Sequence, residues 1–186
     1  MYFSASDFSI LSGRYILLDN DFLGEIFKDK NILESIVKKF PTSYLTIDEF
    51  NKFEFLREVF LPSQITLKEE FISQESIFFP SEFHHETLKK IYTNGLIISQ
   101  IYAHQSASKG IKGWGTVDLL LAGRLMMSHQ NSALITGNRR HFLSCVFDTV
   151  GLININKGDE TIQVFSILVF NKSRFDEKYK ELSVLA

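Results

Sequence analysis

Three oxygen-bearing side chains occupy positions where an apolar segment ends or a helix begins. Asp19 directly follows the apolar run 15–18, Asp118 lies near the start of an otherwise apolar stretch, and Asn138 follows the apolar run 133–135. Burying any of these groups without a partner is costly, so each needs a hydrogen-bonding partner or a metal. Mg²⁺ and Mn²⁺ bind carboxylate and amide oxygens. The residue types therefore predict a shared divalent cation.

The elements that would position these residues alternate between strands and helices. Short apolar runs predict strands at 15–18, 44–47, 133–135, 152–155 and 162–170. Apolar residues at helical spacing predict helices within 31–40, 48–60, 81–98 and 116–129. This alternation is typical of a three-layer α/β/α fold with a mainly parallel central sheet. In such sheets ligands bind beyond the carboxyl ends of the strands, where Asp19 and Asn138 are expected.

Two helix starts are predicted from capping residues. Asn31 is the expected N-cap of the helix within 31–40, and Asp48 is the expected N-cap of the helix that follows the second strand. The apolar side of that second helix would carry Phe50, Phe53, Leu56 and Phe60.

Composition favours one globular domain over residues 1–186, with a helical insertion at about 62–110. The 186 residues are 45% hydrophobic and 23% charged. A formal net charge of −2 excludes a global positive field and argues against a protein that coats DNA. Cys145 is the only cysteine, so we expect no internal disulfide, and no apolar run approaches the length of a membrane span. We therefore expect a cytoplasmic protein without a membrane partner.

Two of the motifs resemble those of the PIN-domain nucleases, a family that includes the toxins of many bacterial toxin–antitoxin pairs. The family's opening motif is an apolar strand followed by Asp-Thr-Asn and an apolar pair, and its place is taken here by Leu17-Leu18-Asp19-Asn20-Asp21-Phe22-Leu23. The later motif is an Asp-x-x-x-Ala helix, then a strand, then Thr-x-Asp/Asn-x-x-His/Asp-Phe. It is similar to Asp118-Leu119-Leu120-Leu121-Ala122 followed by Thr136-Gly137-Asn138-Arg139-Arg140-His141-Phe142. The similarity extends over residues 15–57 and 116–142.

A further motif of the resemblance concerns the helix after the second strand. Glu54 follows the expected cap Asp48 by six residues, which makes Glu54 the implied second acid. Glu49 is the rival, because an idealised helical wheel places it nearer the middle of the apolar side. We prefer Glu54 and leave Glu49 open.

The resemblance implies an endoribonuclease that hydrolyses RNA phosphodiester bonds with Mg²⁺ or Mn²⁺. Its implied catalytic residues are Asp19, Glu54, Asp118 and Asn138, and the first three of these would bind the metal. Positive charge for RNA would come from Arg139, Arg140 and Lys112. The expected partners are RNA, an antitoxin protein if the chain is a toxin, and a second copy of the chain in a homodimer. Clustered acids should also give at least one carboxylate a raised pKa.

Other interpretations remain open. Asp19 and Asp21 also resemble the Asp-x-Asp strand end of haloacid-dehalogenase-like phosphatases, in which Asp19 would be the nucleophile and Asp21 the acid and base. The neutral Asn138, and Asn20 in place of the family's usual threonine, would fit an inactive PIN-like scaffold that binds RNA or protein. Asp118 alone could simply complement the N-terminus of its helix.

Overall fold

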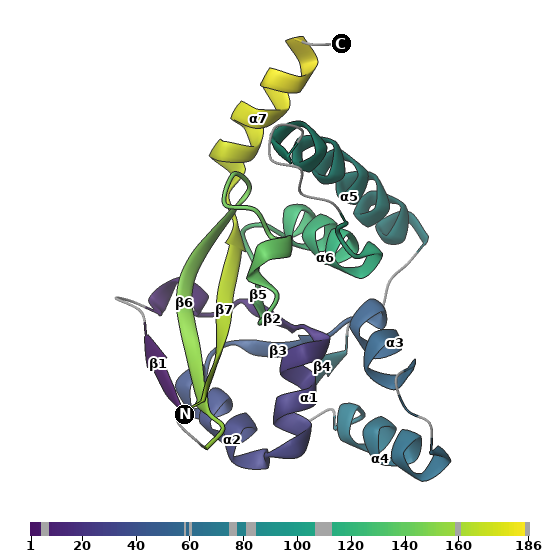
Figure 1. Ribbon diagram of the computed structural model, residues 1–186, viewed down its shortest axis with the longest axis vertical. Coiled ribbons are helices and arrows are strands. Elements are labelled where there is room, and N and C mark those ends of the chain that lie inside the picture. The colour runs from purple at the N-terminus through teal and green to yellow at the C-terminus, as the bar shows by residue number, and fades with distance from the viewer. Residues whose placement is uncertain are drawn as a thin grey trace.

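The computed structural model describes residues 1–4, 8–57, 59, 61–74, 78–80, 85–106, 113–158 and 161–184. In these ranges, helices pack on both faces of one seven-stranded sheet (Figure 1). The strands are β1 (Tyr2–Ser4), β2 (Tyr15–Leu18), β3 (Tyr44–Ile47), β4 (Phe78–Pro80), β5 (Ser132–Thr136), β6 (Phe147–Asn156) and β7 (Ile162–Phe170). The α-helices are α1 (Asn20–Lys28), α2 (Lys30–Lys39), α3 (Glu49–Arg57), α4 (Pro62–Ile72), α5 (His85–Ser106), α6 (Thr116–Met127) and α7 (Lys172–Val184), and the short 3₁₀ helices are η1 (Ser9–Leu11) and η2 (Arg139–His141).

The sheet is mixed, so the expectation of a mainly parallel sheet is wrong. Its strand order is β1-β6-β7-β5-β2-β3-β4. Strands β5, β2, β3 and β4 pair in parallel, whereas β1 with β6, β6 with β7 and β7 with β5 are antiparallel. The longest pairing, β6 with β7, is one of the antiparallel ones, and antiparallel pairing is the more extensive kind.

The cause lies in the connection between the last two strands. A parallel crossover needs roughly a dozen residues or more, and usually a helix. Only residues 157–161 separate β6 from β7. The two strands therefore form a hairpin, and β1 extends the antiparallel half on the other side of β6.

The central strands alternate between two apolar cores, one on each face of the sheet. Leu18 and Ile135 belong to the core beneath α1 and α2, while Leu17 and Leu134 belong to the core beneath α5 and α6. The predicted strands at 15–18, 44–47 and 162–170 are confirmed with these bounds, and the strands predicted at 133–135 and 152–155 are longer than expected.

The two predicted helix caps had different outcomes. Asp48 caps α3 as predicted, because its Oδ1 accepts hydrogen bonds from the backbone N–H groups of Phe50 and Asn51 at 3.1 and 3.2 Å. Helix α2 begins two residues earlier than expected, so its N-cap is Asp29 rather than Asn31, and Asn31 N donates to Asp29 Oδ1 at 3.0 Å.

The expected apolar side of α3 is confirmed for Leu56, which packs against the core beneath α1 and α2, but is wrong for Phe53. Phe53 is 64% exposed, whereas Phe55 is 1% exposed and packs in the core beneath α1 and α2. Phe55 shares its side of the helix with the buried Asn51, four residues earlier. Phe60, also expected on this side, lies outside the described residues.

The segment 62–110 contains α4 and α5, as its helical spacing predicted, and also the short edge strand β4. Helix α5 runs through Asn94 and Gly95 without a break. At Gly95 and Gly123 the backbones of α5 and α6 touch: a Cβ on Gly95 would lie 2.9 Å from Leu119 O, and one on Gly123 would lie 2.8 Å from Gly95 N. This contact fixes α6, which carries Asp118, against α5.

Among the described helices, none combines the length and the apolar character needed to cross a membrane.

Candidate active site

Three neighbouring parallel strands end at buried polar residues. Asp19 follows β2, Asp48 follows β3, and Thr136 is the last residue of β5, and these side chains are 5%, 0% and 0% exposed. Since β5, β2 and β3 are adjacent and parallel, their carboxyl ends lie along the same edge of the sheet. This edge is where α/β folds bind ligands.

Asp19 is connected to the end of β5 through a threonine hydroxyl. Thr136 Oγ1 donates to Asp19 Oδ2 at 2.6 Å, and Asn138 N donates to Thr136 Oγ1 at 2.9 Å. The other oxygen of Asp19, Oδ1, accepts from Asn20 N at 2.8 Å and caps α1. Two residues predicted for the site, Asp19 and Asn138, therefore meet through a hydroxyl group that the sequence interpretation did not assign to the site.

Asp118 enters the same network from the start of α6. Its Oδ2 accepts a hydrogen bond from Gly115 N at 3.1 Å and lies 2.7 Å from His141 Nδ1. His141 Nδ1 also lies 2.6 Å from Asn138 Nδ2. Asp118 therefore complements its own helix N-terminus, as the simpler interpretation expected. Its Oδ2 and Asn138 Nδ2 also lie beside the same ring nitrogen of His141, which forms a hydrogen bond with one of them at a time.

Asp21, which the sequence placed only in the phosphatase interpretation, also belongs to this cluster. Its Oδ2 accepts from Gly137 N at 2.9 Å, while its Oδ1 is buried and has no hydrogen-bond partner. A Cβ at position 137 would lie 2.6 Å from Asp21 Oδ2, so glycine is required for this approach. The signal that could have identified Asp21 is its position two residues after Asp19, in the first turn of α1.

Within this cluster the pKa values of the Asp19 and Asp21 carboxyl groups are raised, as the sequence predicted for at least one acid. Burial is the main cause for Asp19, and the charge of Asp118 raises its pKa further, against the hydrogen bonds from Thr136 and Asn20 and the charge of His141. Burial, followed by the charge of Asp19, raises the pKa of Asp21 to about 7. Burial thus contributes more than the repulsion between acids. A bound cation would oppose both effects.

The acid expected from α3 is Glu54, with Glu49 as its rival. Glu54 lies in the second turn of α3, where its Oε1 forms an ion pair with Arg57 at 3.3 Å. Glu49 is exposed at the start of the helix, beside Asp48. The α3 residue that reaches the end of β2 is Asn51, whose Nδ2 donates to Leu18 O at 2.5 Å. The preference for Glu54 over Glu49 stays a prediction.

The residues expected to contact RNA have different surroundings. Arg139 is tied into the fold, because its guanidinium donates to Thr149 Oγ1 at 2.9 Å and to the carbonyl oxygen of Phe142. Arg140 is exposed at the rim, and its Nε donates to Asn138 Oδ1 at 3.3 Å. Lys112 lies outside the described residues. Arg140 is therefore the cation best placed to meet a phosphate.

The oxygen donors suit a hard cation that keeps most of its water. Across the described ranges, no group of three or more His, Cys, Asp or Glu side chains is close enough to enclose a metal ion. Mg²⁺ commonly uses only one or two carboxylates together with water and phosphate. The unpaired Oδ1 of Asp21 and the buried carboxylate of Asp19 match that requirement. A closed site of the structural zinc type does not fit.

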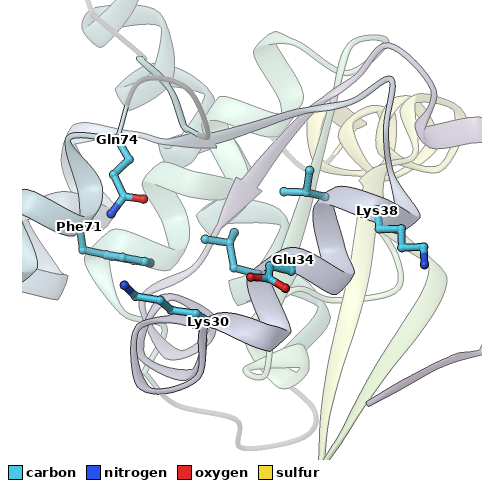
Figure 2. Close-up of a pocket in the computed structure, with 7 residues that line it drawn as sticks. Lys30, Glu34, Lys38, Phe71 and Gln74 are labelled. Carbon is cyan, nitrogen blue, oxygen red and sulfur yellow. The ribbon is translucent and has the colours of Figure 1, made fainter.

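A separate hollow of about 390 Å³ lies between α2 and the end of α4 (Figure 2). Its floor is apolar, and the polar groups around it come from Lys30, Glu34, Lys38 and Gln74. None of its lining residues belongs to the cluster around Asp19. This hollow therefore does not contribute to the candidate active site.

No protein-family model, curated protein or solved structure matches this chain. The resemblance to PIN-domain nucleases consequently rests on the motifs in the sequence and on where the fold places them.

Proposed function

We propose that the chain is an Mg²⁺- or Mn²⁺-dependent endoribonuclease with a PIN-like fold. One observation carries the proposal: Asp19, Asp118 and Asn138, which are far apart in the sequence, meet in one hydrogen-bonded network at the carboxyl ends of β2 and β5. A role as the toxin of a toxin–antitoxin pair, with an antitoxin protein and a homodimer as partners, belongs to the same proposal.

The chain's own residues would bind and orient the reactants. Asp19 and Asp118 would hold the cation, with Thr136 fixing the orientation of Asp19 and His141 that of Asp118. When bound, the cation would lower the pKa of a water molecule and stabilise negative charge on the phosphate. Arg140 at the rim would hold the RNA backbone through a phosphate. Glu54, in the second turn of α3, would complete the shell of the cation or orient the attacking water.

The test is cleavage of a single-stranded RNA oligonucleotide in Mg²⁺, in Mn²⁺ and in EDTA. Asp19→Asn should lower the rate at least about 100-fold, since it removes a charge on which cation binding depends. The same variant should be as stable as the wild type in EDTA, or more stable, because the buried carboxylate carries a raised pKa. Asp29→Asn, which changes the N-cap of α2, is the matched control and should retain full activity.

Cleavage by Asp19→Asn at the wild-type rate would overturn the proposal. So would a wild-type protein whose activity is absent, or is the same in EDTA as in Mg²⁺.

Two alternative functions are supported by fewer observations. A phosphatase would use the Asp19 and Asp21 pair, but Asp19 is 5% exposed and both of its oxygens already accept hydrogen bonds. A non-catalytic scaffold is favoured by the neutral side chains Asn51 and Asn138. Trapping of a phosphoaspartate at Asp19 would identify the phosphatase, and RNA binding without cleavage would identify the scaffold.

A further inference from the structure

Two positions around the site carry neutral amides. Asn138 follows β5, and Asn51 is the residue that α3 presents to the end of β2. Neither amide supplies the negative charge that attracts a divalent cation. The charge of the site must therefore come from carboxylates on other elements.

Asp21 has the properties of such a carboxylate. It is held in place on one side only, because Gly137 N donates to its Oδ2 while its Oδ1 is buried and unpaired. An acid in the first turn of a helix usually complements the positive helix end from the surface. That role explains neither the burial of Oδ1 nor the close approach to Gly137, which only glycine permits.

Asn51 gives an independent observation on the other side of Asp19. Its side chain is fully buried, and its Nδ2 is anchored on Leu18 O, the residue before Asp19. Its Oδ1 has no hydrogen-bond partner. Unpaired buried oxygens are rare and costly, so each one needs an explanation such as an ion. Three of them occur along this edge of the sheet: Asp21 Oδ1 on α1 and Asn51 Oδ1 on α3, the two helices that meet the end of β2, and Asp48 Oδ2 at the end of β3.

We infer that Asp21 joins Asp19 as a directly coordinating carboxylate and that Asn51 Oδ1 supplies a neutral ligand in place of the acid expected from Glu54. This inference rests on the proposed function for the identity of the cation, Mg²⁺ or Mn²⁺. Asp118 keeps the role that the proposed function gives it and binds the same cation from the start of α6.

The experiment measures Mn²⁺ binding to the full chain by calorimetry, together with the rise in the unfolding midpoint on adding Mn²⁺. Asp21→Asn should weaken binding at least tenfold and abolish most of the rise. Asn51→Ala, which removes the unpaired Oδ1, should also weaken binding and reduce the rise. Asp29→Asn is the control and should bind as the wild type does. Circular dichroism in EDTA checks that each variant folds.

These measurements separate a failure of this inference from a failure of the proposed function. Unchanged Mn²⁺ affinity in Asp21→Asn would overturn the role of Asp21, even if the wild type cleaves RNA. If Asp21→Asn does not fold, Asn51→Ala decides: unchanged or stronger binding overturns the assignment. Loss of binding in Asp21→Asn, in a protein that cleaves no RNA, would support the cation site and reject the nuclease.

Discussion

Asp48 gives a prediction that depends only on the fold. It is fully buried at the end of β3, and it caps α3 through the N–H groups of Phe50 and Asn51. Burial raises the pKa of its carboxyl group to about 6, against the lowering effect of these hydrogen bonds and of the Arg124 charge. The native protein therefore keeps the Asp48 proton to a higher pH than the unfolded chain, whose value is 3.8.

The sign of the effect follows from proton binding. Between about pH 4 and pH 6 the native state binds more protons at this residue than the unfolded state does, so its contribution to stability falls as pH rises. A shift of the Asp48 pKa from 3.8 to about 6 means that the native state loses about 3 kcal/mol of stability above pH 6. Asp48→Asn keeps the shape and the capping oxygen but has no proton to lose. The free energy of unfolding of the variant should thus exceed that of the wild type by up to about 3 kcal/mol at pH 8, and by under about 1 kcal/mol at pH 4.

Urea unfolding followed by circular dichroism from pH 4 to pH 8 measures this difference, and other titrating groups cancel in the comparison. The control is Phe53→Ala, which alters an exposed side chain that does not titrate and should differ from the wild type by the same amount at every pH. A difference between Asp48→Asn and wild type that stays constant with pH would refute the reasoning, as would a variant that is less stable at pH 8.

Two further predictions concern packing. Gly123→Ala should lower the free energy of unfolding by at least about 2 kcal/mol, because the new methyl group meets the backbone of α5, whereas Gly24→Ala in α1, where a Cβ meets nothing within 4 Å, should raise it by up to about 1 kcal/mol. Equal effects in urea titrations would contradict the direct contact of the two helices. Phe55→Ala should cost about 3–5 kcal/mol and the exposed Phe53→Ala under about 0.5 kcal/mol. The reverse order of thermal midpoints would mean that α3 packs on its other side.

Local patterns in the sequence predicted the positions of the strand ends well. Apolar runs bounded by polar residues identified β2 and β3, and so placed Asp19 beyond the end of β2 and Asp48 at the start of the helix after β3. Strand direction was harder, because an apolar run looks the same whichever way its neighbour points. The short connection after β6 was the available signal for a hairpin, and it should have outweighed the helix alternation found earlier in the chain.

The site could be predicted only in part, for a related reason. Asp19 and Asp118 follow from strand and helix ends, but the contribution of α3 depends on which side of a nine-residue helix faces the site. A shift of one residue in the assumed contact changes the choice between Glu49, Asn51 and Glu54. Asp21 was missed as a member of the site because its burial results from Gly137, a residue more than a hundred positions away.

The glycine contact between α5 and α6 has a mechanical consequence. With backbone against backbone at Gly95 and Gly123, no side chains lie between the helices there, so the position of α6 follows that of α5 closely. Asp118 lies in the first turn of α6, whereas Asp19 and Asp21 come from the end of β2 and the first turn of α1. A residue larger than glycine at position 123 would push the two helices apart and move Asp118 relative to Asp19.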